Sequence, residues 1–243
     1  MALLSVEHVG KTHWVGPYEK RVLVDVSLAM RSGDLFGVWG AQRSGKSTLL
    51  RIVAGIETPD AGTVRFDGTD LATLSKTRRD RLRLGEIGLV QGDGPRSGTL
   101  TVLDYVALPL FGRCTRHEAR RRALAALRRV DVAECRDALW HQLSDGEQTL
   151  INLAHALVRE PRLLLVDDPT AGLDTRQQQE VAELLQTVAA EDQLAVLATS
   201  SVLSATAEMH ATFTLSDGRL IPIADPRPGG EVIEFPRGEQ TGS

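Results

Sequence analysis

The sequence lacks the features that mark membrane-spanning, secreted and general nucleic-acid-binding proteins. Its 243 residues contain no apolar run close to the ~20 residues that a transmembrane helix requires. The N-terminus has neither a basic segment nor a sustained apolar segment, so we expect no signal peptide. The net charge of -4 argues against a general binder of nucleic acid, which would normally carry a basic face.

Cysteine is also scarce, and the sequence has no repeat and no low-complexity tract. The two cysteines, Cys114 and Cys135, show neither a CxxC motif nor a metal-binding spacing. We therefore expect reduced thiols in a cytosolic protein. A hydrophobic content of 42 % is ample for a core, and this length fits one large α/β domain or two small ones.

The strongest positive feature is a loop that fits the pattern G-x-x-x-x-G-K-[ST], between an apolar run at 35–38 and a helical stretch at 47–53. Glycines at both ends let successive backbone N–H groups point at phosphate oxygens, and the following helix presents its positive end. Lys46 supplies a charge for the outer phosphates, and the Ser47 hydroxyl is a hard oxygen ligand suited to Mg²⁺. The loop predicts a site for a nucleoside triphosphate, formed by Gly40, Ala41, Gln42, Arg43, Ser44, Gly45, Lys46, Ser47 and Thr48.

The rest of the chain reads as strands followed by alternating helices and strands. Strand-like segments occur at 3–9, 21–30 and 63–66, with turn signals between them. Residues 101–130 are mostly helical, and we interpret the arginine-rich face of 116–129 as solvated, with contact to lipid headgroups or a partner as the alternative. Helices at 146–158 and 175–191 each precede a buried strand, at 163–166 and 194–199. This alternation around a phosphate loop predicts an α/β fold with a parallel sheet flanked by helices.

Aspartates at the ends of these elements carry the remaining chemistry. Asp167 ends the strand at 163–166, which can run beside the strand of the phosphate loop and aim a carboxylate at Mg²⁺. Asp168 follows where a base would polarise water for attack on the γ-phosphate. Asp174 ends the next turn, and residues 143–148 form a second glycine turn that enters a helix. Any one aspartate alone is more often a helix cap or turn residue, but this order of motifs favours a functional set.

With these motifs in order, residues 3–220 resemble the nucleotide-binding domain of ATP-binding cassette (ABC) transporters. The phosphate loop corresponds to Walker A, 163–167 to Walker B, 143–147 to the signature motif and 171–174 to the D-loop. The segment at 100–110 is similar to the lipoprotein-release, macrolide-exporter and cell-division subgroup.

The resemblance implies a P-loop NTPase with an N-terminal antiparallel β subdomain and a helical subdomain, at about 93–160, that carries the signature. An ABC-type domain would span 1–221, and a Pro/Gly-rich tail 222–243. ATP and Mg²⁺ are the implied cofactors, with Ser47 and Asp167 as the metal ligands. His13 or the adjacent Trp14 would stack on the adenine. The signature residues that would face a partner's ATP are Ser144, Asp145, Gly146 and Glu147.

The departures from the family pattern lie around the γ-phosphate. The catalytic glutamate of the family is Asp168 here, one methylene shorter, and its switch histidine is Ser200. An ungapped match puts Gly92 at the position of the Q-loop glutamine, and Gln91 stands one place early. A one-residue slip in a strand points a side chain to the other face, unless a bulge corrects it. In the signature, Asp145 replaces a glycine. These changes predict a binding site for ATP with attenuated hydrolysis.

The sequence therefore predicts the ATP-binding subunit of an ABC transporter, peripheral on the cytoplasmic side of the cell membrane. It would form a head-to-tail dimer, with membrane-spanning partner subunits contacting the region at 91–112. A heterodimer with a second ABC subunit is favoured because the signature keeps Ser144 and Gly146 while the Walker half is altered; a homodimer is the alternative. A second hypothesis is a pseudo-ATPase, a regulatory module that binds ATP and hydrolyses little. A soluble ABC protein of repair or translation and a small-molecule kinase fit less well, and we expect no nucleic-acid partner.

Overall fold

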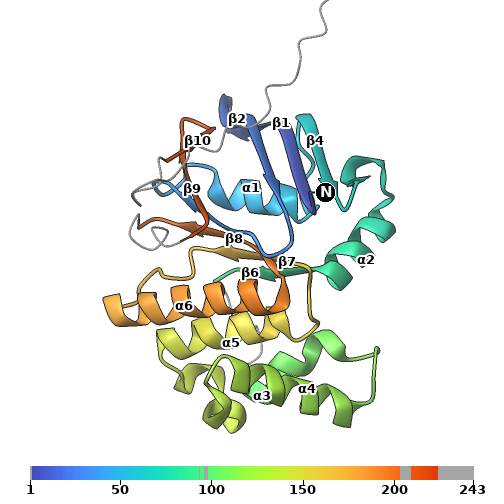
Figure 1. Ribbon diagram of the computed structural model, residues 1–243, viewed down its shortest axis with the longest axis vertical. Helices are drawn as coiled ribbons and strands as arrows, with labels where there is room; N and C mark the ends of the chain where they lie inside the picture. The colour runs from blue at the N-terminus through green and yellow to red at the C-terminus, as the bar shows by residue number, and fades with distance from the viewer. Residues whose placement is uncertain (1, 93, 96–97, 203–208, 224–243) are drawn as a thin grey trace, which may run out of the picture.

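The computed structural model describes residues 2–92, 94–95, 98–202 and 209–223, and it arranges them in layers (Figure 1). An antiparallel sheet forms one outer layer, followed by a helix, a second sheet and two layers of helices. Most of the predicted tail at 222–243 lies outside the described residues. Pro222 itself ends a strand of the second sheet, so regular structure extends one residue past the domain boundary that we predicted.

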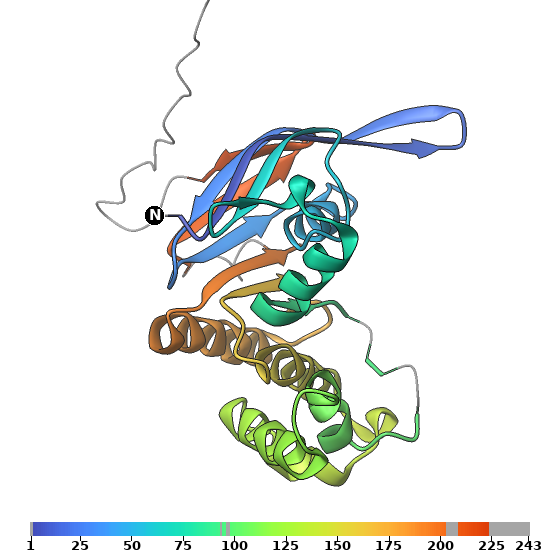
Figure 2. The ribbon, with the colours of Figure 1, turned by 90° about the vertical axis from the view of Figure 1, so that its right-hand side faces the viewer.

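The first sheet is antiparallel, as the resemblance implied. Its strand order is β2-β1-β4-β5. The strands are β1 (Leu4–Val15), β2 (Tyr18–Met30), β4 (Ala61–Phe66) and β5 (Thr69–Asp70). The joined ends of β1 and β2 extend away from the body as a hairpin (Figure 2).

The second sheet has six strands in the order β10-β9-β3-β8-β7-β6. Its members are β3 (Leu35–Trp39), β6 (Ile87–Val90), β7 (Leu163–Asp167), β8 (Ala195–Ser200), β9 (Ala211–Ser216) and β10 (Arg219–Pro222). All neighbours are parallel except β9 and β10, so the predicted parallel core is confirmed.

One expectation about this sheet is wrong, because β7 does not run beside β3. Strand β8 lies between them and pairs with both in parallel. The consequence for the site is small, since the carboxyl ends of parallel strands meet at the same sheet edge. Asp167 therefore still reaches the edge at which the phosphate loop begins.

Helix α1 (Lys46–Val53) lies between the two sheets (Figure 1). Its apolar residues, among them Leu49, Leu50 and Val53, are almost fully buried in a cluster with residues of both sheets. The opposite face of the six-stranded sheet is covered by α5 (Asp145–Leu157) and α6 (Thr175–Asp192), which contribute to a second hydrophobic cluster. The phosphate loop thus leads into a helix that packs against a sheet on each side.

The outermost helices form the predicted helical region. They are α3 (Val102–Ala107) and α4 (Arg116–Arg129), while α2 (Lys76–Glu86) precedes β6. The apolar stripe of α4 is buried against its neighbours, and Ala119, Ala123 and Leu127 are fully covered. Short 3₁₀ turns complete the chain at η1 (Leu71–Thr73), η2 (Leu108–Leu110), η3 (Ala133–Asp137) and η4 (Trp140–Gln142). None of the helices in the described ranges has the length and apolar character of a membrane span.

Both cysteines are free thiols in this structure. Burial, aided by the Glu147 carboxylate, raises the pKa of the Cys135 thiol to about 11, so it stays protonated at neutral pH.

Candidate functional site

The phosphate loop leaves β3 and enters α1 through two glycines that have no room for a side chain. A Cβ on Gly40 would lie 2.7 Å from the Ser44 Oγ and 2.8 Å from the Leu215 carbonyl. Gly45 has φ 113°, and a Cβ there would lie 2.7 Å from the Val22 carbonyl. These two positions explain why the loop pattern requires glycine at both ends.

Lys46, the first residue of α1, is folded into the loop and only 6 % exposed. Its ammonium donates to the carbonyls of Gly40 at 2.7 Å and Ala41 at 3.0 Å. Burial lowers the pKa of Lys46, and the nearby charges of Asp168 and Asp167 oppose this shift. The chain therefore keeps a partly desolvated cation at the head of the loop, where an anion would be attracted.

A cavity of about 650 Å³ opens in front of this lysine. Seven of the nine predicted loop residues line it, while Gly40 and Ala41 contribute carbonyls behind it. Asp167 and Asp168 line the same cavity, so the structure brings the two Walker motifs together. The lining also includes Lys20 and Val22. Sequence reasoning missed these residues because strand pairing, rather than a local motif, brings them to the cavity.

The residues present fit a nucleotide phosphate with Mg²⁺. The Ser44 Oγ is buried in the loop with no hydrogen-bond partner among the described residues, as expected for a hydroxyl that awaits a ligand. Ser47 and Asp167 face the cavity with one hydroxyl and one carboxylate, which are the hard oxygen donors that Mg²⁺ prefers.

The two aspartates at the end of β7 have different partners. Asp167 accepts a hydrogen bond from the Thr199 Oγ1 at 2.8 Å. Asp168 has a left-handed φ of 48°, and Ser201 donates to both of its oxygens, from Oγ to Oδ2 at 2.6 Å and from the backbone N–H to Oδ1 at 3.3 Å. The Ser201 Oγ also accepts from Lys46 at 3.4 Å. Ser201 therefore connects Asp168 to Lys46.

Ser200, which we expected at the γ-phosphate, does not face this cavity. It is the last residue of β8 and 3 % exposed; its Oγ lies 3.4 Å from the Thr170 Oγ1 and accepts from the Val202 N–H at 3.0 Å. The next residue, Ser201, lines the cavity instead. Successive side chains of a strand point to opposite faces, and the strand end determines which of the two serines faces the lysine.

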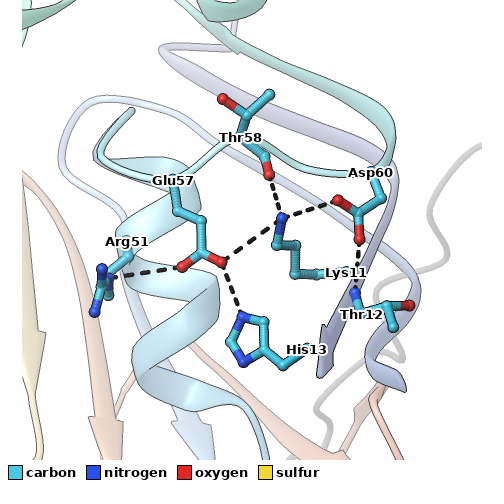
Figure 3. Close-up of polar contacts among 7 residues, drawn as sticks. All are labelled: Lys11, Thr12, His13, Arg51, Glu57, Thr58 and Asp60. Carbon is cyan, nitrogen blue, oxygen red and sulfur yellow. Dashed lines mark hydrogen bonds and ion pairs between the residues drawn. The ribbon is translucent and has the colours of Figure 1, made fainter. Parts of the chain in front are cut away.

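Of the two candidate base-stacking residues, the structure brings His13 to the cavity and leaves Trp14 outside it. His13 lies directly opposite Lys20 in the β1–β2 pair, and both line the cavity. Trp14 follows in the same strand, faces the other way and is 70 % exposed. The His13 Nε2 lies 2.8 Å from the Glu57 Oε1 (Figure 3).

The loop after β6 agrees with a one-residue slip. Gly92 lines the cavity, whereas Gln91 is exposed and is not part of the lining. A Cβ on Gly92 would meet no atom within 4 Å, so the backbone leaves space for a side chain at that position.

The signature turn forms the start of α5. Ser144 is the N-cap, and its hydroxyl and N–H donate to the Glu147 carboxylate at 2.8 and 2.7 Å. Asp145 lines a smaller hollow of about 280 Å³ that also borders Asp167 and Asp168. Asp174 caps α6 in the same manner. Ser144 and Asp145 are exposed, whereas Gly146 is buried, so capping leaves the first two accessible to a ligand or partner.

Comparison with known proteins gives consistent matches in sequence. The sequence model of the family described as "ABC transporter" matches residues 23–171. The chain is 36 % identical over 220 residues to the lipoprotein-releasing system ATP-binding protein LolD of Bordetella pertussis, which covers 90 % of this chain and 95 % of that protein. It is 33 % identical over 235 residues to the macrolide export ATP-binding/permease protein MacB 1/2 of Paracoccus denitrificans, covering 93 % of this chain and 35 % of that protein.

Solved structures match the fold over nearly the same length. The dimeric ATP-binding cassette MJ0796, solved with ADP and Pi, superimposes with a TM-score of 0.82 at 28 % identity and covers 89 % of this chain and 96 % of that one. The cbiO1 protein of Clostridium perfringens, part of an ABC transporter complex, gives a TM-score of 0.80 at 26 % identity, covering 90 % and 87 %. The motifs, the layered fold and these matches agree: the chain belongs to the ABC transporter family, as an ATP-binding cassette.

Proposed function

We propose that this cassette binds Mg-ATP in the cavity in front of Lys46 and powers movement of a substrate by membrane-spanning partner subunits, on the cytoplasmic side of the membrane. The observation that carries the proposal is a single cavity lined by the phosphate loop and by both aspartates of β7. Names of the relatives support the partner class, since LolD belongs to a lipoprotein-releasing system and MacB joins an ATP-binding part to a permease.

In the proposed mechanism the chain supplies positioning and charge. Lys46 exchanges the carbonyls of Gly40 and Ala41 for phosphate oxygens, and the Ser44 hydroxyl gains its missing partner. Ser47 and Asp167 would hold Mg²⁺, which stabilises the charge that develops on the phosphate. Asp168 orients and polarises the attacking water.

We further propose that hydrolysis at this chain's own site is slow. Asp168 is one methylene shorter than glutamate, and an error of ~1 Å in the position of the water can cost on the order of 10²-fold in rate. The Asp168 carboxylate is also engaged at both oxygens by Ser201. The same observations favour the second hypothesis, a pseudo-ATPase with a regulatory role, in which turnover would be negligible in the assembled complex as well.

Nucleotide titration of the purified chain in the presence of Mg²⁺ tests the binding site. We expect Lys46→Ala to weaken ATP binding roughly ten- to hundredfold, because a buried cation that bonds phosphate oxygens is lost. Lys76→Ala is a matched control and should leave the affinity unchanged, since Lys76 likewise begins a helix but is exposed and does not line the cavity. Equal affinities of wild type and Lys46→Ala would contradict the assignment.

We also propose a heterodimer in which the signature motif of this chain completes a catalytically competent ATP site on another cassette. The exposed Ser144 at the start of α5 supports this role, since the signature keeps this serine while Asp168 and Ser200 depart from the family pattern. In the reconstituted transporter, Ser144→Arg should abolish most ATPase activity, whereas Asp168→Asn should remove little. The opposite ranking would favour a homodimer that hydrolyses ATP at this chain's own Walker motifs.

A further inference from the structure

A cluster of charged side chains lies between β1 and the segment that connects α1 to β4 (Figure 3). Its centre is the Glu57 carboxylate, with Oε1 2.8 Å from the His13 Nε2 and 3.7 Å from the Lys11 Nζ. The Arg51 Nε lies 3.7 Å from the other oxygen. The Glu57 side chain is only 20 % exposed. The carboxylate thus joins the strand that carries His13 to the end of the helix that begins at the phosphate loop.

His13 is the member of this cluster that reaches the nucleotide cavity. An ionised carboxylate only accepts hydrogen bonds, so the His13 Nε2 must carry the proton of this contact. In the described part of the chain the imidazole has no other hydrogen-bond partner. Glu57 therefore fixes both the protonated nitrogen and the direction of the ring, as carboxylates do for histidines in many sites.

We propose that Glu57 is a positioning residue for the nucleobase, acting through His13. This inference rests on the proposed function, in which the cavity holds a nucleotide. Stacking of a side chain on the base strengthens ATP binding only if the ring is held in position. An imidazole that rotates freely must be ordered on binding, and this cost would cancel part of the affinity that stacking adds. The base would then be bound by two residues acting together, His13 as the stacking ring and Glu57 as the group that orients it.

Asp60 offers a matched control on the same connecting segment. Its carboxylate accepts from the Lys11 Nζ at 2.8 Å and from the Thr12 N–H at 2.8 Å, without a hydrogen bond to His13. Lys11 also donates to the Thr58 carbonyl at 2.8 Å, so it keeps two partners when Glu57 is removed. Loss of Glu57 therefore leaves the strand anchored, whereas the imidazole loses its only described partner.

The test compares Mg-ATP with Mg-tripolyphosphate, which has the phosphates but no base, in titrations of the full chain. Glu57→Ala should weaken ATP binding roughly three- to tenfold, the equivalent of one hydrogen bond. Tripolyphosphate affinity should not change, and Asp60→Ala should leave both ligands unaffected. Glu57→Gln should restore most of the ATP affinity, because its carbonyl oxygen still accepts from the imidazole. His13→Ala should cost ATP roughly five- to hundredfold, as expected for a lost stacking partner.

A double mutant separates positioning from a structural role. In the His13→Ala background, Glu57→Ala should have no further effect on ATP affinity. A further loss there, or an equal loss for tripolyphosphate, would overturn the proposal and assign Glu57 to the stability of the segment. Failure of the wild type to bind either ligand would instead refute the proposed function itself.

Discussion

His155 should make the stability of this cassette fall in mild acid. The residue lies on α5 and stacks on Tyr105, with ring centroids 4.5 Å apart and an angle of 10° between the planes. Burial lowers the pKa of His155 from 6.5 to about 4, and the charge of Arg159 adds to the shift. The imidazole is thus neutral in the folded chain at all but strongly acidic pH.

The sign of the effect follows from proton uptake on unfolding. Between pH 4 and pH 6.5 the unfolded chain binds a proton at His155 that the folded chain does not, so the free energy of unfolding decreases as the pH falls through this range. Each unit of pKa shift corresponds to ~1.4 kcal/mol, which gives a full loss of about 3 kcal/mol and about 2 kcal/mol at pH 5. Above pH 6.5 the contribution is constant.

Urea unfolding at pH 7.5 and pH 5, followed by circular dichroism, measures this loss. The His155→Gln variant cannot be protonated, so its free energy of unfolding should change about 2 kcal/mol less between the two pH values than that of the wild type. His117→Gln, at an exposed position on α4, is the control and should behave as the wild type does. An equal pH dependence in wild type and His155→Gln would refute the reasoning.

Four further variants test the site. Gly45→Ala should lose nucleotide binding in a titration, because its φ of 113° and the adjacent carbonyl exclude a Cβ. Gly92→Gln should leave the melting temperature unchanged, since space is open there, and should raise the rate of phosphate release. Ser201→Ala should raise the rate of phosphate release by no more than about tenfold, because it removes a hydrogen bond to the Asp168 carboxylate. Ser200→Ala should leave this rate unaltered. A larger effect of Ser200→Ala than of Ser201→Ala would mean that Ser200 acts in the site.

Much of the architecture could be predicted because the determining signals are local. The phosphate loop has a fixed length and glycines at both ends, and the closely packed backbone around Gly40 and Gly45 explains the pattern. Buried strands of a parallel sheet, such as β7, are continuous apolar runs and can therefore be recognised in the sequence. Helix α4 lies within the region at 101–130 that was predicted to be mostly helical.

The errors concern long-range order and single-residue register. Strand order is a property of pairing between distant segments, so nothing in β3 or β7 revealed that β8 would separate them. Ser200 and Ser201 are chemically identical neighbours, and only the end of β8 decides which one faces Lys46. Lys20 could have been found only by pairing β2 with β1 in the correct register.

The most direct test of the account is the hydrolysis rate of prebound Mg-ATP in a single turnover. We predict that the wild type is slow, that Asp168→Glu is faster by on the order of ten- to hundredfold, and that the ATP affinities of the two proteins are equal. Lys46→Ala sets the baseline for a site that cannot hold the phosphates. A wild type that hydrolyses ATP rapidly, with no gain from Asp168→Glu, would contradict the claim that this cassette holds ATP at an attenuated site.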